Sequence, residues 1–376
     1  MNYLISNEAT FSTSSTQVIL VRHARSNYNE QGRYQGSSDD SILTEKGHRD
    51  AFVTGLSLKE YNFDAIYTSP LTRVQQTTQE IFSSLKENNN SPPIFIDPLL
   101  TEINMSNWHG LYYQEVKEKF PDDYKSWQET PHLFTFNDTF YPVLELCDRA
   151  RQFWQKVLTK HRGATILVVA HGGTNRALIS TAIDLQPQAY HTLQQSNCGI
   201  SCLEFPSDHN CGWLKYLNCT EHLGETLPKL KAGKTGWRWL LLANDNYQNS
   251  TNYSYLTKLI NSNYIDLIVT DNSQLSESLA NQFSIPNTIM PLSISQNYCF
   301  DNWQHKLLLT SQKHSLTSIL IIASNELLTK ILSKNLNISI VNLIDCLTVI
   351  HYPQFYNHVI LQGLLPLRKL KNNKCQ

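Results

Sequence analysis

The chain has 376 residues, of which 41% are hydrophobic and 17% charged, and its formal net charge at pH 7 is -1. The length is that of two ordinary domains, and the composition is typical of a globular protein. The near-neutral charge argues against a general binder of nucleic acid or membrane surfaces, so an anion site must be a local cluster of charges. No apolar run approaches the roughly 20 residues that span a bilayer. Residues 1–17 also lack the features of a signal peptide, which predicts a cytoplasmic protein, or a stromal one if the source organism has plastids.

The first recognisable element is the run Val-Ile-Leu-Val at residues 18–21. Four consecutive apolar residues of this kind predict a strand buried on both faces, as in a parallel sheet covered by helices. Arg22 and His23 follow at the carboxyl end of that strand, where open α/β sheets bind their ligands. Three further polar residues follow closely, namely Arg25, Ser26 and Asn29. Guanidinium groups beside an imidazole suit a phosphate dianion, although an isolated Arg-His pair could simply be a solvated strand end.

The next elements alternate between helix and strand. Thr44 is expected to cap a helix that runs toward residue 61, and a short strand over residues 63–68 leads into a helix that begins near Arg73. A helix over 143–160 then precedes a second fully buried strand over 165–170. This alternation predicts an α/β protein with a doubly wound, mostly parallel sheet and helices on both faces. The remaining expectations are small helices within the aromatic-rich segment 111–142, a strand over 200–205 and its hairpin partner over 213–217.

His171 follows the second buried strand directly, and Gly172 and Gly173 come before a helix expected from residue 176. Glycines allow close approach of a ligand to the backbone, and the first N–H groups of a helix attract anions. The ends of the three strands converge in a doubly wound sheet, which brings His23, His171 and Arg73 to one crevice.

Phosphoryl transfer depends mainly on stabilising negative charge on the phosphate oxygens. Arg22 and Arg73 are therefore the expected clamp on these oxygens, and a protonated His171 is expected to donate a third contact. His23 is the candidate nucleophile. Glu102, on a loop beside the crevice, is the candidate acid that protonates the leaving group.

The second half of the chain repeats this order of strands, but the residues that follow the strands are different. The strand-like runs 239–245, 265–270 and 318–324 match the strands described above in the same order, with Asn-Asp in place of Arg-His and Ser324 in place of the second histidine. The interval from Thr68 to His171 is 103 residues, whereas that from Thr270 to Ser324 is 54, so the region of Glu102 is missing. We therefore expect a catalytic domain over 1–220, a linker over 221–236 and a smaller, degenerate, non-catalytic copy over 237–376. Two unrelated α/β domains are the alternative.

Residues 18–29 resemble the Arg-His-Gly signature of the histidine phosphatase superfamily, which includes the cofactor-dependent phosphoglycerate mutases. Further matching motifs lie in the order typical of that family, at residues 34–36, 43–47, 68–73, 100–110 and 170–172. The resemblance implies a phosphoglycerate mutase-like fold in which His23 carries the phosphoryl group and Glu102 is the proton donor. It also implies a phosphate pocket of Arg22, Asn29, Arg73 and His171, with secondary contacts from Gln35, Gly36 and the backbone N–H of Gly172.

Within that superfamily, residues 102–146 and 195–199 are most similar to the plant 2-carboxy-D-arabinitol 1-phosphate phosphatases, which also carry a degenerate second domain. Two departures from the wider family matter. Ala24 stands where a glycine is usual, so its methyl group could crowd the phosphate. The segment 111–142 lacks the proline-rich run of the mutases, which favours hydrolysis.

The sequence therefore predicts a phosphatase that hydrolyses a small sugar or sugar-acid phosphate through a phosphohistidine, with no cofactor and no metal ion. The expected partner is a small phosphorylated metabolite, without nucleic acid or membrane. A phosphoglycerate mutase and a protein that only senses a phosphorylated metabolite are the alternatives. The choice of sugar phosphate, and whether the chain forms a homodimer, stay open at this stage.

Overall fold

The computed structural model describes residues 15–86, 91–207, 211–245, 250–283, 289–291, 315–336, 343, 345–354 and 358–367. The strands of the first half are β1 (Thr16–Arg22), β2 (Ala65–Thr68), β3 (Ile94–Ile96), β4 (Thr165–Ala170), β5 (Ile200–Phe205) and β6 (Trp213–Cys219). Its helices are α1 (Asn27–Gln31), α2 (Glu45–Ser57), α3 (Thr72–Lys86), α4 (Tyr113–Lys119), α5 (Pro121–Glu129), α6 (Pro142–Lys160) and α7 (Gly172–Ala182). The strands of the second half are β7 (Gly236–Ala243), β8 (Leu267–Thr270), β9 (Ile289–Pro291), β10 (Leu316–Ala323), β11 (Cys346–Tyr352) and β12 (Ile360–Pro366), and its helices are α8 (Ser250–Asn261), α9 (Gln274–Ala280) and α11 (Asn325–Leu336).

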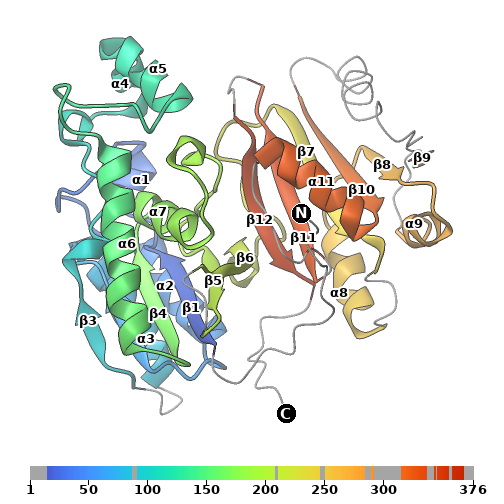
Figure 1. Cartoon of the computed structure of the whole chain (residues 1–376), viewed down its shortest axis with the longest axis horizontal. Helices are drawn as coiled ribbons and strands as arrows, with labels where there is room; N and C mark the ends of the chain where they lie inside the picture. The colour runs from blue at the N-terminus through green and yellow to red at the C-terminus, as the bar shows by residue number, and fades with distance from the viewer. Residues whose placement is uncertain are drawn as a thin grey trace, which may run out of the picture.

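The described strands form one twelve-stranded sheet in the order β3-β2-β4-β1-β5-β6-β12-β11-β7-β10-β8-β9 (Figure 1). The four strands from β3 to β1 are parallel, as predicted, whereas β5 and β6 run antiparallel to their neighbours. The sheet is therefore mixed rather than mostly parallel: the antiparallel hairpin of β5 and β6 was expected, whereas the antiparallel pairing of β5 with β1 and the hairpin of β11 and β12 were not. The reason is that β5, β6 and their counterparts are joined by short hairpin connections, which cannot link parallel strands.

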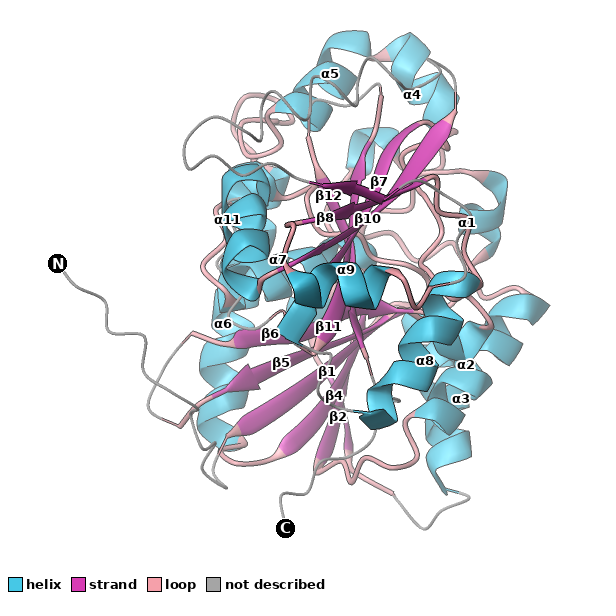
Figure 2. Cartoon of the chain, turned by 90° about the vertical axis from the view of Figure 1, so that its right-hand side faces the viewer, coloured by secondary structure: helices cyan, strands magenta, loops and turns pink. Residues whose placement is uncertain are grey.

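Strand β1 shows why this segment forms the centre of the first half. Val18 and Leu20 belong to the apolar cluster that contains residues of α6 and α7, whereas Ile19 and Val21 belong to the cluster that contains residues of α3 and Leu58, which directly follows α2. Because side chains alternate along a strand, helices are needed on both faces of the sheet to bury this run (Figure 2).

Several predicted boundaries moved in the structure. Thr44 does cap α2, since its side chain accepts a hydrogen bond from the backbone N–H of Gly47, but the helix ends at Ser57 rather than near residue 61. Helix α7 begins at Gly172, four residues earlier than predicted, because glycine at a helix start does not prevent helical geometry. The segment 111–142 contains two short helices, α4 and α5, as expected. The edge strand β3 and the hairpin β11–β12 were not predicted.

The strand order of the second half corresponds to that of the first. Read from the middle of the sheet outward, both halves place their sixth, fifth, first, fourth, second and third strands in succession. The descent of the second half from a copy of the first stays a prediction, as do the domain boundaries at 220 and 236. Strand β12 lies beside β6, so the two halves contribute to one sheet.

The two halves meet where β6 and β12 lie side by side. Hydrogen bonds join the two strands there, and apolar side chains from both halves pack on each face of the sheet. Leu364 of β12 pairs with Leu217 of β6, and the side-chain amide of Asn218 donates to the carbonyl oxygen of Gln362 at 2.8 Å. Both large apolar clusters contain residues from the two halves, for example Trp154 and Trp239 in one of them. The two halves therefore share one continuous core. Across the described segments, no helix combines the length and apolar character needed to cross a membrane.

Deleting the residues after Gly236 should lower stability strongly, because it would expose the apolar surface that the halves bury against each other. We expect the midpoint of thermal unfolding to fall by more than about 10 °C, or the truncated chain to aggregate. Differential scanning calorimetry and size-exclusion chromatography of both chains measure this. A truncated chain that is monomeric and as stable as the full chain would contradict a shared core.

Candidate active site

His23 lies directly after β1 and is buried, with 2% of its surface exposed. Its backbone N–H donates to the carbonyl oxygen of Ala170 at 2.9 Å, which continues the pairing of β1 with β4. Its ring Nδ1 lies 2.8 Å from the carbonyl oxygen of Ala24. Because a carbonyl oxygen can only accept, Nδ1 carries the proton and Nε2 keeps its lone pair. The lone pair of a neutral His23 therefore lies on Nε2.

His171 lies beside it, as the N-cap residue of α7. The two imidazole centroids are 5.3 Å apart, with an angle of 67° between the ring planes. Its Nε2 lies 2.8 Å from the hydroxyl oxygen of Ser69, and its buried Nδ1 has no hydrogen-bond partner among the described residues. A buried ring nitrogen without a partner is costly, so it indicates a position where a ligand completes the contacts.

Two guanidinium groups complete the positive side of the site. Arg22 donates through Nη1 to the carbonyl oxygen of Gln195 at 2.8 Å, and the fully buried Arg73 donates through Nη2 to the carbonyl oxygen of Gly36 at 2.8 Å. The Nε atoms of both arginines are buried without a partner among the residues that the structure describes. Burial lowers the pKa of Arg22, and it lowers that of Arg73 to about 10. Both groups remain charged at neutral pH, and their Nε–H groups can donate to an anion.

Glu102 faces this cluster from the start of α7. Its Oε2 accepts from the backbone N–H of Gly173 at 3.0 Å, and its Oε1 accepts from that of Thr174 at 3.0 Å. Its charge acts on both Arg22 and Arg73, which places the carboxylate on the same crevice. A Cβ atom at position 173 would lie 2.5 Å from Oε1, so only glycine leaves room for this carboxylate. The first turn of α7 therefore fixes the position of Glu102.

The charges of the cluster decide the state of its histidines. Burial, followed by the charges of Arg22 and Arg73, lowers the pKa of His23 well below its usual value. Burial, followed by Arg73 and His23, does the same to the pKa of His171. Both rings are therefore neutral at pH 7. The lowered pKa does not support a protonated His171 in the site without a phosphate, because burial, and then the charge of Arg73, disfavours a charged ring. A neutral ring still donates one N–H.

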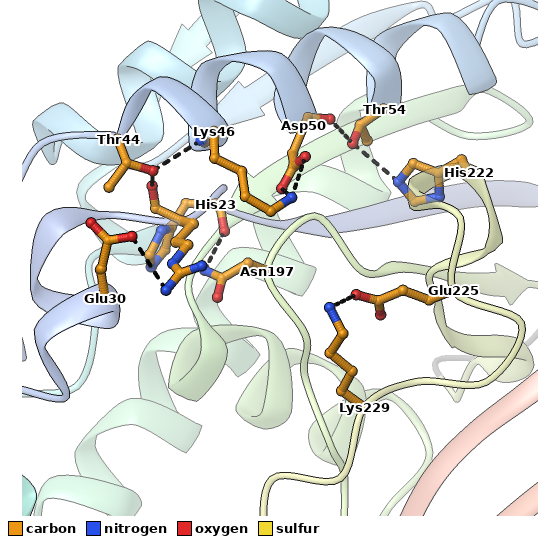
Figure 3. A network of polar contacts seen from close by, with 12 residues as sticks. His23, Glu30, Thr44, Lys46, Asp50, Thr54, Asn197, His222, Glu225 and Lys229 are labelled. Atoms are coloured by element: carbon orange, nitrogen blue, oxygen red, sulfur yellow. Dashed lines mark hydrogen bonds and ion pairs between the residues drawn. The ribbon is translucent and has the colours of Figure 1, made fainter.

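The predicted supporting residues lie on the loops around this cluster. Asn29 accepts through Oδ1 from the side-chain amide of Asn197 at 2.9 Å, and that amide also contacts the carbonyl oxygen of His23 at 3.0 Å (Figure 3). Gln35 accepts from the hydroxyl group of Ser26 at 2.9 Å, and Gly36, with φ of 57°, directs its carbonyl oxygen at Arg73. These contacts hold the residues that surround the imidazole and the guanidinium groups.

Two predictions need correction or comment. Arg25 forms an ion pair with Glu30 at 3.3 Å and is partly exposed, so its contacts give no support to the prediction that it binds substrate. The methyl group of Ala24 packs in a small apolar cluster with Leu43, Ala51 and Cys198. Ala24 is therefore accommodated within the protein, which removes the reason to expect that it crowds a phosphate.

Three residues of the site were not singled out from the sequence: Ser69, Gln195 and Asn197. Ser69 contacts His171, and the loop over 195–197 contacts Arg22 and His23. All three lie within motifs that the sequence already matched, over residues 68–73 and 195–199. These three residues act through a hydroxyl, a backbone carbonyl and an amide. Such groups occur in ordinary loops too, so the sequence alone gave no reason to single them out.

Comparison with known proteins agrees with this geometry. The family model of the histidine phosphatase superfamily (branch 1) matches residues 18–220, more than half of the chain. The chain belongs to this superfamily. The match contains the whole cluster from Arg22 to His171 and ends at the segment that joins the two halves.

Individual relatives cover the same region of this superfamily member. It is 44% identical over 192 residues to the probable 2-carboxy-D-arabinitol-1-phosphatase of Arabidopsis thaliana, which covers 51% of this chain and 38% of the plant protein. It is 32% identical to phosphoserine phosphatase 1 of Hydrogenobacter thermophilus, which covers 56% of this chain and 95% of that protein. Among solved structures, Bacillus stearothermophilus YhfR matches with a TM-score of 0.50 and 25% identity, over 55% of this chain and 99% of that one. This likeness supports a phosphoglycerate mutase-like fold for the first half.

A half-buried histidine outside the cluster, His222, makes stability depend on pH. His222 lies 3.1 Å from the hydroxyl oxygen of Thr54 (Figure 3), and burial lowers its pKa from 6.5 to about 4. Below about pH 6.5 the unfolded chain binds the proton and the folded chain does not, so stability falls until about pH 4. We expect His222→Gln to reduce the loss of unfolding free energy between pH 7 and pH 5 by about 1 kcal/mol. Urea denaturation at both pH values measures this, and an unchanged difference would contradict it.

Proposed function

We propose that this protein is a phosphatase that hydrolyses small phosphate monoesters through a phosphohistidine at His23, without a metal ion. The observation that carries the proposal is the neutral His23, with a free lone pair on Nε2, between two buried guanidinium groups that lack acidic partners among the described residues. Arg22 and Arg73 supply the positive charge that a phosphoryl group requires.

In the first step, Nε2 of His23 attacks phosphorus and the bond from phosphorus to the ester oxygen breaks. The electron pair of that bond goes to the leaving oxygen, which takes a proton from the protonated form of Glu102 and leaves Glu102 as the carboxylate that accepts from Gly173 and Thr174. The carbonyl oxygen of Ala24 holds the Nδ1–H of His23 and so stabilises the ring as it becomes cationic. Arg22, Arg73 and His171 donate to the phosphoryl oxygens, where the negative charge is spread.

In the second step, a water molecule attacks the phosphohistidine and gives its proton to the carboxylate of Glu102. The bond between phosphorus and Nε2 breaks, and its electron pair returns to the ring. The products are orthophosphate and the starting enzyme. The position of Glu102 against the first turn of α7 suits it to both transfers, because one carboxyl group must face the departing alcohol and the arriving water in turn.

A sugar-acid phosphate is the substrate class that the relatives favour. The names of the plant relatives refer to 2-carboxy-D-arabinitol 1-phosphate, and that of the bacterial relative to phosphoserine. Both compounds carry a carboxylate as well as a phosphate. We therefore propose a phosphorylated small acid as the substrate, with 2-carboxy-D-arabinitol 1-phosphate as one member of the class.

Replacing the nucleophile tests the reaction. His23→Ala should lower the hydrolysis of 4-nitrophenyl phosphate by more than roughly a thousandfold, because no other side chain replaces the attacking ring nitrogen. Acid-quenched mass spectrometry of the wild-type protein should show a phosphoryl group on His23. Retained activity in the variant would refute the mechanism, and isomerisation of 3-phosphoglycerate with a bisphosphate primer would indicate a mutase instead.

The role of Glu102 is tested by the leaving group. Glu102→Gln should lower kcat/KM for an alkyl phosphate by about a hundredfold or more, since an alkoxide cannot leave without a proton. The effect on 4-nitrophenyl phosphate should be less than about tenfold, because nitrophenolate leaves unprotonated. Equal losses for both substrates would show that Glu102 positions α7 rather than donating a proton.

A further inference from the structure

The segment between the two halves carries a lysine into the neighbourhood of the phosphate site. The ammonium group of Lys231 contacts the carbonyl oxygen of Gln195, and this is the same oxygen that accepts the hydrogen bond from Arg22 at 2.8 Å. Two cationic groups on one carbonyl oxygen are necessarily close neighbours. The charge of Lys231 also contributes to lowering the pKa of His23.

Arg176 adds a third positive charge at this place. It lies on α7, donates through Nε to the carbonyl oxygen of Leu193 at 2.8 Å, and has its guanidinium carbon 5.6 Å from the ring centroid of Tyr190. Lys231 is exposed as a residue, but its ammonium group is turned toward Gln195, and desolvation there, followed by the charges of Arg22 and Arg176, lowers its pKa. Like charges this close repel each other, and an anion bound among them removes that repulsion.

Within the described ranges, no carboxylate forms an ion pair with this group, although the charge of Glu102 acts on Arg22. None of the ion pairs found there includes Arg22, Arg176 or Lys231. The acid that acts on Lys231 is Glu225, but Glu225 is paired with Lys229 at 2.7 Å (Figure 3). As an ammonium has three donors and Lys231 uses one of them on Gln195, donors remain for a ligand.

The second half of the chain holds Lys231 in place. The side-chain amide of Gln194 donates to the carbonyl oxygen of Lys229 at 3.0 Å, which ties the joining segment to the loop beside the site. From the other side, Arg238 on β7 donates to the carbonyl oxygen of Pro228 at 2.6 Å, and Gln362 on β12 donates to the same oxygen at 3.1 Å. The joining segment is thus clamped on both sides, three and two residues before Lys231.

We propose that Lys231, together with Arg176, forms a second anion subsite that binds a carboxylate or a second phosphate of the substrate while the first phosphate occupies the site at His23. This inference rests on the proposed phosphatase function and goes beyond it, because it assigns substrate selection to the joining segment and to the second half that positions it. Lys231 lies after residue 220, where the match to the family model ends.

The test uses three substrates that differ at one carbon: glycerol 3-phosphate, 3-phosphoglycerate and glycerol 1,3-bisphosphate. In the wild-type protein, one or both of the doubly anionic substrates should have the higher kcat/KM. Lys231→Met should lower kcat/KM for that substrate, relative to glycerol 3-phosphate, by roughly 10- to 100-fold through KM, as expected for a lost charged hydrogen bond. The substrate that responds identifies the second group as carboxylate or phosphate.

Matched variants separate a specific contact from a structural effect. Lys234→Met removes an exposed lysine of the same segment, and it should leave the substrate ratios unchanged. Lys231→Arg should restore most of the preference, and Lys231→Gln serves if the methionine variant is unstable. An equal loss for all three substrates, or a wild-type protein without preference for a second anion, would overturn the proposal. Hydrolysis of 4-nitrophenyl phosphate that depends on His23 would show in either case that the phosphatase function stands.

Discussion

The parallel pairing of β1 with β4 is the constraint on which the site depends. Its register sets Arg22 opposite Ala170, so the next residue on each strand, His23 and His171, comes to the same height at the carboxyl edge of the sheet. The two imidazoles lie together because two fully buried strands end at matching positions. A shift of one residue would turn one ring into the opposite helix layer and destroy the pair.

The buried guanidinium groups of this arrangement are stabilised by backbone carbonyl oxygens rather than by carboxylates. Arg22 and Arg73 are held by the carbonyl oxygens of Gln195 and Gly36, which orient the guanidinium groups without cancelling their charge. Carboxylate partners would have stabilised the arginines more and left less attraction for a phosphate. The same surroundings keep His23 neutral, so one set of contacts both prepares the nucleophile and attracts its target.

Much of the first half could be predicted from sequence because its signals are local. The buried run at 165–170 forms β4 within the predicted limits, and Thr44 caps α2 as expected. The position of α7 was less well predicted, since the preference of glycine against helix is weaker than the tertiary contacts at Gly172 and Gly173. The role of Lys231 could not be predicted at all. Its place beside Arg22 depends on hydrogen bonds from Gln194, Arg238 and Gln362, which come from segments far apart in the chain.

The corresponding strand ends of the second half show the opposite situation to the site at His23. The pairing of β7 with β10 ends at Ala243 and Ala323, so Asn244 and Ser324 occupy the places of the two histidines. This corrects the sequence alignment by one residue, since the sequence pattern had placed Asp245 at the position of His23. Asn244 donates to the hydroxyl oxygens of Ser273 and Ser276, and the side chain of Asp271 accepts from the backbone N–H of Ser324. These neutral and acidic groups satisfy one another, so this edge offers no counterpart to the positive cluster at His23.

The continuous sheet also limits how copies of this protein meet in solution. Strands β6 and β12 each cover an edge of the other, so β3 and β9 are the outermost of the strands that the structure describes. Each of these is only three residues long. Short terminal strands present few unpaired backbone groups, so pairing with a strand of another molecule forms few hydrogen bonds. A wide sheet is therefore compatible with resistance to aggregation.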